Sequence, residues 1–260
     1  MEEEEGVYVY CIIEVDEEKR FGPIGMGGRG DQVHTICFQG LAAVVSDSSI
    51  TKYSISRENM MAHERVIEAV MKDHTVLPVV FSTIATSPED VRELLRARYA
   101  EFKNMLKEIE GKVELGVRAL WKNKDMIFQE ILEENGDIKR LKESIAAKPP
   151  DHTYAGRVRI GEMVKAALES KREKEEKEII KMLKEISVQY RTHKVYGDSM
   201  IMNAAFLVDK AREEEFDRRM DELTTKHEHR IVFKYVGPAP PYNFVNIVVA
   251  WRRQTDVFAR

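Results

Sequence analysis

KVELGVRALW, residues 112–121, lies where the first of two predicted domains ends and the second begins. This stretch is predicted to form a β-strand. Two helical segments, 124–134 and 137–147, follow and end at Lys148-Pro149-Pro150, because a proline drives the preceding residue out of the helical region. A further helix is predicted from Arg157 to Ile186.

The part of the chain after that helix completes a recognisable order of elements. Two strands, VQYRTHKVY and MIMNAAFLV, surround Gly197-Asp198, and a helix from about Arg212 to Lys226 precedes the strand HRIVFKYV. With 112–121 and the long helix, the order is β-α-β-β-α-β, the ferredoxin-like split βαβ. Within the long helix, the run KREKEEKE, residues 171–178, holds no apolar residue. We therefore expect the middle of this helix to project into water and not to form a charged docking site.

The part of the chain before residue 112 predicts strands and helices in a comparable order. VYVYCIIEV, residues 7–15, is nearly all apolar and indicates a strand buried on both faces. The other elements are a hairpin of strands 33–38 and 41–47 around Gln39-Gly40, a helix capped by Ser54 or Ser56 and ending near Asp73, an edge or bulged strand in 75–85 with Pro78, and a helix from Ser87-Pro88 to Gly111.

Together these patterns predict an α+β fold of two small domains with ferredoxin-like (βαββαβ) character. Antiparallel sheets would carry helices on one face, and a helical insert near 124–147 would elaborate the second domain. The predicted boundaries are 1–111 for the first domain, 112–236 for the second, and 237–260 for a C-terminal tail rich in proline and aromatic residues.

The composition of the chain favours some classes of protein over others. Of 260 residues, 43% are hydrophobic and 33% are charged, with a net charge of −4, which favours a folded globular protein and does not favour a nucleic-acid partner. Four acids follow Met1, where a secretory signal would carry positive charge, and no run of eighteen apolar residues occurs, so neither export nor a membrane span is expected. Cys11 and Cys37 lie in apolar strand-like runs, where a buried free thiol in a reducing cytoplasm is commoner than a disulfide.

No group of residues predicts catalysis, a metal or a cofactor. The five glycines of FGPIGMGGRGD, residues 21–31, favour a loop, because the Gly-Lys-Ser/Thr ending of a phosphate-binding loop is missing. His63-Glu64 lacks the second zinc ligand, since Ile67 stands four residues after His63. His227 and His229 have no third ligand nearby and are interpreted as solvated histidines. No strand carries the aromatic RNA-binding pattern.

Several segments together resemble the gas vesicle protein F/L family. They are VYVYCII near the N-terminus, HERVIEAVM (63–71) with TVLPVVF (75–81), VELGVRALW (113–121) and GPAPPYNFV (237–245), in the family's order. The chain departs from the family at Val80-Phe81-Ser82, where Arg-Phe-Gly is commoner, and at Ala239, where Trp is commoner.

The resemblance implies a non-enzymatic accessory protein of the gas vesicle, cytoplasmic or part of the organelle, without a cofactor. Its implied partners are the small hydrophobic shell protein, which it would bind as a chaperone-like or minor structural component, and other gas vesicle accessory proteins. The alternative left open by the fold is a ferredoxin-like regulatory protein that binds a small molecule. The oligomeric state, the face of the vesicle wall and retention in the mature vesicle are not indicated.

The stretch KYVGPAPPYNFVNIVVAW, residues 234–251, carries no charge after Lys234. Its Gly-Pro-x-Pro-Pro segment is expected to interrupt regular structure and to hold an extended backbone. In one interpretation the tail plugs its own domain core or a groove between domains. In the other, it docks the shell protein by strand addition or exposed aromatics. The residues assigned to that partner-binding role are Pro240, Pro241, Tyr242, Phe244 and Val245.

Overall fold

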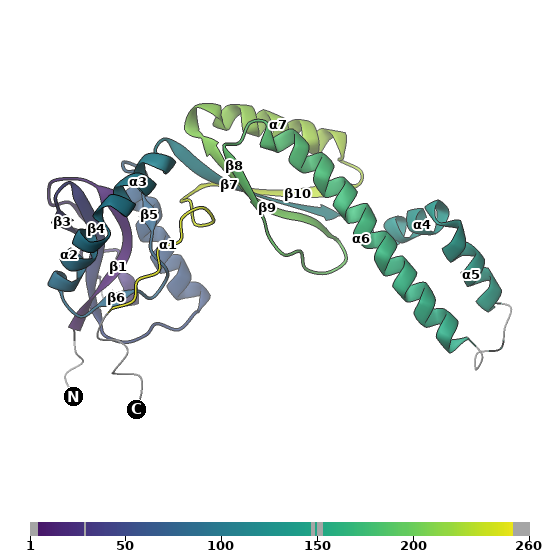
Figure 1. Cartoon of the computed structure of the whole chain (residues 1–260), viewed down its shortest axis with the longest axis horizontal. Helices are drawn as coiled ribbons and strands as arrows, with labels where there is room; N and C mark the ends of the chain where they lie inside the picture. The colour runs from purple at the N-terminus through teal and green to yellow at the C-terminus, as the bar shows by residue number, and fades with distance from the viewer. Residues whose placement is uncertain (1–4, 29, 147–148, 150–152, 252–260) are drawn as a thin grey trace. The chain divides into compact units, whose positions relative to one another are not determined.

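The computed structural model describes residues 5–28, 30–146, 149 and 153–251, which fold into two compact units (Figure 1). Unit 1 contains the chain up to Glu114 and again from Pro238, and unit 2 contains Leu115–Gly237. The division therefore lies three residues beyond the boundary drawn from the sequence. The described part of the predicted tail belongs to unit 1, and its residues 252–260 lie outside the described ranges.

Unit 1 is built on one antiparallel sheet with the strand order β2-β3-β4-β1-β5, and β6 also pairs with β1. The hairpin between β3 and β4 turns at Gln39 and Gly40, which both have positive φ, at 47° and 79°. This geometry matches a two-residue hairpin turn of the type that follows the twist of the sheet. The elements are β1 Glu5–Glu14, β2 Arg20–Gly22, the 3₁₀ turn η1 Met26–Gly28, β3 Val33–Phe38, β4 Leu41–Ser49, α1 Arg57–Met71, β5 Leu77–Pro78, β6 Ile84–Ala85, α2 Pro88–Ala97 and α3 Tyr99–Ile109.

Strand β1 is buried on both faces, as predicted, and a bulge changes which face its residues occupy. The register to β4 shifts between Val9 and Cys11, so that Tyr10 is the extra residue. Tyr8, Tyr10, Cys11 and Ile13 pack with α1, whereas Val7, Val9 and Ile12 pack with α2 and α3. Unit 1 thus has helices on both faces of its sheet, and the expectation of helices on one face is corrected here, because a strand with two apolar faces needs cover on each side.

The helices of unit 1 begin where their capping residues predict. The side chain of Ser56 accepts a hydrogen bond from Asn59 N, and that of Ser87 accepts one from Asp90 N, with Pro88 in the first turn. The single helix expected from Pro88 to Gly111 is divided at Arg98, whose ψ of 22° leaves the helical region. Both α2 and α3 contribute buried side chains to the same core.

Unit 2 follows the predicted β-α-β-β-α-β order with the helical insert between the first strand and the long helix. Its sheet has the order β10-β7-β9-β8. Mixed helices and antiparallel sheets in the two units confirm the predicted α+β class. The elements are β7 Lys112–Trp121, α4 Lys124–Glu134, α5 Gly136–Ala146, α6 Tyr154–Lys184, β8 Gln189–Thr192, β9 Met200–Asp209, the 3₁₀ turn η3 Lys210–Arg212, α7 Glu213–Lys226 and β10 Ile231–Ala239.

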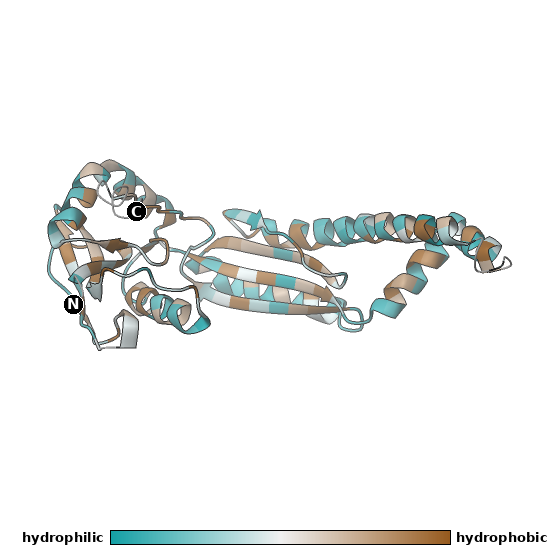
Figure 2. Cartoon of the chain, turned by 90° about the horizontal axis from the view of Figure 1, so that it is seen from below, coloured by the Kyte–Doolittle hydropathy of each residue, from teal (hydrophilic) through white to brown (hydrophobic). Residues whose placement is uncertain are grey.

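Helix α7 packs on one face of the unit 2 sheet, and Figure 2 shows the other face of that sheet toward the viewer. Phe206 of β9 and Phe216 of α7 have ring centroids 5.4 Å apart, and Phe216 stacks on Tyr235 of β10 at 5.8 Å. Strand β10 continues through Gly237 and Pro238, although the sequence led us to expect an interruption there. Pro238 is tolerated because β10 is an edge strand, where one missing N–H breaks no ladder bond.

Among the helices in the described ranges, none combines the length and the apolar character needed to cross a bilayer.

Candidate functional site

Residues 240–251, which we call the C-terminal segment, complete the core of unit 1. From Val245 onward the side chains alternate between the core and the surface, as in a half-buried strand. Val245 and Ile247 are 4% and 0% exposed, and Val249 and Trp251 pack against the same core as α2 and α3. Asn246, Val248 and Ala250 point outward. Residues from the end of the chain therefore fill a place in the first half of the fold.

The C-terminal segment is held by backbone contacts next to β5. Val79 and Ile247 form a parallel β-bridge, and Val80 N donates a hydrogen bond to the carbonyl of Ile247 at 3.2 Å. Arg98 Nη1 donates to the carbonyl of Val248 at 3.1 Å. We call Val79, Val80 and Arg98, with the core beneath them, the slot. Its geometry is that of strand addition at a sheet edge.

The entry to the slot is fixed by a buried carboxylate. Asn243 N donates to Glu114 Oε2 at 2.7 Å, and Asn243 Nδ2 donates to Glu114 Oε1. Glu114 is only 6% exposed, so these charge-assisted bonds compensate part of its desolvation. Asn243 lies within a turn in which Phe244 N and Val245 N both donate to the carbonyl of Pro241. The sequence contained no local signal for this pair, because its members are 129 residues apart.

The five residues assigned to partner binding are mostly enclosed by unit 1. Pro240, Pro241 and Val245 are buried, whereas Tyr242 and Phe244 are partly exposed. Tyr242 packs against the core under α1, and burial raises the pKa of its hydroxyl. The segment therefore lies where the plug interpretation places it. A partner-binding role for these side chains stays a prediction.

A buried polar cluster lies under α1 in the same unit. Tyr8 Oη contacts His63 Nδ1 at 3.1 Å and accepts a hydrogen bond from Ser82 N at 2.9 Å. Since Ser82 supplies the donor to Tyr8, the Tyr8 hydroxyl is free to donate to a neutral His63. Burial lowers the pKa of His63 to about 4, which keeps the ring neutral. His63 is therefore a core residue whose hydrogen bonding is satisfied.

The remaining candidate residues are scattered. Cys11 is buried with its thiol pKa raised by burial, and Cys37 is partly buried; both are free thiols. His229 is exposed beside Glu228, and His227 is partly buried, which lowers its pKa. Within the ranges that the structure describes, no three His, Cys, Asp or Glu side chains are placed to hold a metal ion.

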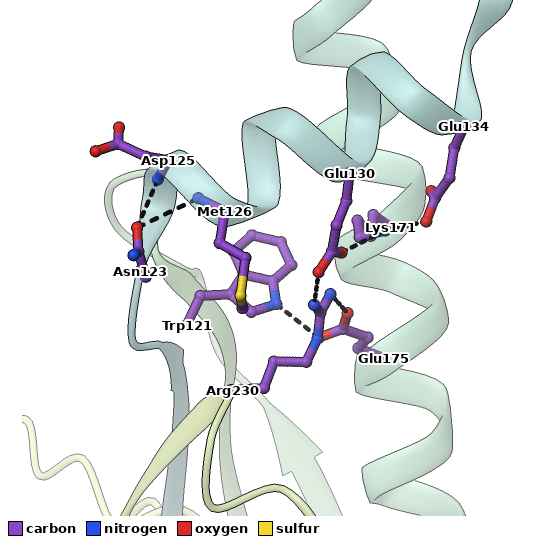
Figure 3. A network of polar contacts seen from close by, with 9 residues as sticks. All are labelled: Trp121, Asn123, Asp125, Met126, Glu130, Glu134, Lys171, Glu175 and Arg230. Carbon is purple, nitrogen blue, oxygen red and sulfur yellow. Dashed lines mark hydrogen bonds and ion pairs between the residues drawn. The ribbon is translucent and has the colours of Figure 1, made fainter.

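A second polar network joins the helical insert to the end of the sheet in unit 2 (Figure 3). Arg230, just before β10, pairs with Glu130 of α4 and, at 2.7 Å, with Glu175 of α6. Trp121 Nε1 also donates to Glu175, at 2.6 Å. Burial would raise the pKa of Glu130, but hydrogen bonds from Arg230 and Lys171 outweigh it, and the pKa is lowered.

This network corrects the expectation for the charged run 171–178. Lys171 bridges Glu130 and Glu134 at 3.0 and 2.6 Å, and the side chains of Lys171 and Glu175 are only 12% and 16% exposed. These two residues are one helical turn apart and face α4 and the sheet, whereas Lys177 and Glu173 remain exposed. Charge alone did not distinguish the two faces, because the partners Glu130 and Arg230 are distant in sequence.

Comparison with known proteins gives consistent matches along the chain. The family model described as gas vesicle synthesis protein GvpL/GvpF matches residues 6–246. Gas vesicle protein F1 of Halobacterium salinarum is 27% identical over 96% of this chain and 97% of its own length. Gas vesicle protein F of a Streptomyces species is 30% identical over 92% of this chain and 98% of its own length. The crystal structure of GvpF from an Anabaena species covers 94% of this chain and 99% of that one, with a TM-score of 0.81 and 23% identity, and shows the same fold.

Proposed function

Because the chain belongs to the gas vesicle synthesis protein GvpL/GvpF family, we propose that it assists assembly of the gas vesicle shell as a chaperone-like or minor structural component. The match of the family model to residues 6–246 carries this proposal, since it includes both units and most of the C-terminal segment. The proposed partners are the small hydrophobic shell protein and other gas vesicle accessory proteins. The proposed location is the cytoplasm, at the growing or finished vesicle.

The surface of unit 2 supports binding of an apolar partner. Both edge strands of its sheet, β8 and β10, carry or adjoin large exposed apolar side chains. Edge strands offer backbone hydrogen bonds to an added strand, and exposed aromatic residues add contact area. The exposed side chains concerned are Val188, Tyr190, Tyr196, Val232, Tyr235 and Val236.

In unit 1, the proposed contribution is limited to the two partly exposed residues of the C-terminal segment. Tyr242 and Phe244 could contact a partner without the segment leaving its slot. Pro240, Pro241 and Val245 would act indirectly, by holding those two side chains in place.

Co-expression with the shell protein tests the proposal. The chain would carry an affinity tag, and the shell protein would be followed in the soluble fraction and in the pull-down. We expect the shell protein to stay soluble and to copurify only when the chain is present. Aggregation of the shell protein regardless of the chain, with nothing captured, would contradict a direct chaperone-like role.

Two paired variants would locate the contact. Tyr190→Ser with Val232→Ser tests the edges of unit 2, and Tyr242→Ala with Phe244→Ala tests the C-terminal segment. Melting temperature must be measured for each. Lost capture at an unchanged melting temperature assigns the contact to that pair, whereas lost capture with a lower melting temperature assigns the pair to the core.

A further inference from the structure

The slot of unit 1 is built from residues that are synthesised long before the segment that fills it. Val79, Val80 and Arg98 precede Ile247 by 168, 167 and 149 residues, and the rest of unit 1 is complete at Glu114. At roughly 5 to 20 residues per second, the 133 residues from Glu114 to Ile247 take about 7 to 27 s. During this interval the apolar slot has no C-terminal segment of its own chain to cover it.

We propose that the slot also accepts the C-terminal segment of a second copy of this chain, so that two copies exchange their last strands. The segment of a second copy has the same Val245, Ile247 and Val249 spacing and the same Asn243 for Glu114. Every contact in the exchanged form is therefore one that the structure shows within a single chain. Strand exchange of this kind is a low-cost route to a dimer, because only the connection changes conformation.

The connection between the units is suited to such an exchange. Gly237 has a φ of 136°, a backbone conformation that favours glycine, and it is followed by Pro238, Pro240 and Pro241. Pro238 fixes φ near the end of β10, whereas Pro240 and Pro241 are already buried in unit 1 at the start of the C-terminal segment, so the connection consists of only a few residues. The unit boundary lies between residues 237 and 238, at the start of this connection. Re-aiming a few residues there redirects the whole segment.

Cysteine cross-linking in full-length chains tests the exchange. Val80 and Val248 each follow one partner of the Val79–Ile247 bridge and are 44% and 62% exposed, so cysteines at these positions would lie side by side on the outer surface. One tagged chain would carry V80C and a differently tagged chain V248C, both with C37S, and the two would be co-expressed and oxidised. We expect a disulfide-linked heterodimer on a non-reducing gel.

Three controls decide the interpretation. V80C with V236C, whose valine is 68% exposed in unit 2, measures random collision, and we expect at least a fivefold lower yield. Adding I247D to the V248C chain should abolish the heterodimer, because a charged side chain cannot enter the slot. A single chain with V80C and V248C must form a disulfide, because the segment lies in the slot in either form.

Each possible result of the cross-linking experiment either supports or overturns strand exchange. A heterodimer that exceeds the collision control and is lost with I247D supports exchange. A yield equal to the collision control, or a doubly substituted chain whose disulfide is always internal, overturns it. The absence of any disulfide in the doubly substituted chain would also overturn it, because the arrangement of segment and slot would then be wrong.

Discussion

His63 illustrates how a single buried residue couples the stability of unit 1 to pH. Its ring is 3% exposed, bonded to Tyr8, and surrounded by the rings of Tyr10 and Phe81. A proton added to the ring would be charged in an apolar environment, which is why burial lowers the pKa from 6.5 to about 4. The unfolded chain binds that proton at a higher pH than the folded chain.

The stability of the protein should therefore fall as the pH is lowered from 6.5 toward 4. Between these values the unfolded state binds more protons, so each step downward in pH favours unfolding. From pH 6.5 to pH 5.0, this residue should account for a loss of about 1.6 kcal/mol in the free energy of unfolding. Urea denaturation of the wild type and of His63→Gln at both pH values measures it. The exposed His229→Gln serves as control, and equal pH dependence in all three proteins would contradict the assignment.

Position 6 has no room for a side chain larger than that of glycine. A Cβ placed there would lie 2.6 Å from the carbonyl oxygen of Ala85 and 2.7 Å from Ile50 Cγ1. The first contact is with backbone, which cannot move away cheaply. Gly6→Ala should lower the free energy of unfolding by about 1 to 3 kcal/mol.

Gly161 in α6 provides the matched control for Gly6. A Cβ at Gly161 meets nothing within 4 Å, so Gly161→Ala should be neutral or stabilising by about 0.5 to 1 kcal/mol, as in other helices. Thermal unfolding of both variants tests the pair. Equal melting temperatures would show that β1 and β6 approach less closely than described.

Residues with a local signal were predictable, and residues defined by distant partners were not. Ser56 and Ser87 cap helices as their positions indicated, because capping depends on neighbours three residues away. Glu114 is bonded by Asn243, which no local pattern connects with it. Ser82 has a φ of 64°, a conformation that favours glycine, and its residue type gave no signal of this.

At the scale of elements, type and order followed from periodicity, whereas the faces of the elements depended on packing. The bulge at Tyr10 and the break at Arg98 were not anticipated, because both leave the apolar composition of the segment unchanged. Helix α6 was predicted as one helix, but its charged middle was assigned to water. The structure divides that run into residues that bind α4 and residues that remain exposed.

Arg230 should contribute more to stability than a typical surface arginine. Its guanidinium is shared by Glu130 and Glu175, and all three side chains are less than a third exposed. Arg230→Met would leave two carboxylates with fewer donors and should lower the free energy of unfolding by about 1 to 3 kcal/mol. Lys177→Met, which removes an exposed pair with Glu173, should change the free energy of unfolding by less than about 0.5 kcal/mol.

Urea unfolding followed by tryptophan fluorescence measures both variants. With Trp251 replaced by Phe, the signal comes from Trp121, which lies beside Glu175. If the two substitutions lowered the free energy of unfolding equally, the network would contribute no more to stability than an exposed ion pair.

At the scale of the whole molecule, the C-terminal segment belongs to the unit in which the chain begins. The sequence indicated an apolar tail that could return to a core, but not which core, since an extended apolar segment fits many grooves. The contacts that answer this question are Val79 with Ile247, 168 positions apart, and Arg98 with Val248, 150 positions apart.

Ile247→Asp should destabilise unit 1 strongly. The side chain is fully buried, and an unpaired carboxylate there should lower the free energy of unfolding by about 3 to 5 kcal/mol. Val248→Asp, one position along and 62% exposed, should have little effect. Amide hydrogen exchange followed by mass spectrometry would show faster exchange in β1 and α3 for the first variant alone. Unchanged protection of these elements would indicate that unit 1 is stable without the segment.

The chain leaves unit 1 after Glu114 and re-enters it at Pro238, and Asn243 binds Glu114 close to both crossings. Unit 2 is thus a guest domain: it is inserted into unit 1, the host, whose two parts lie before and after it in the sequence. A nested guest can be lengthened, shortened or exchanged between relatives without moving the ends to which it is joined. A change of length in the helical insert should therefore leave the host in place, whereas the host depends on residues both before and after unit 2.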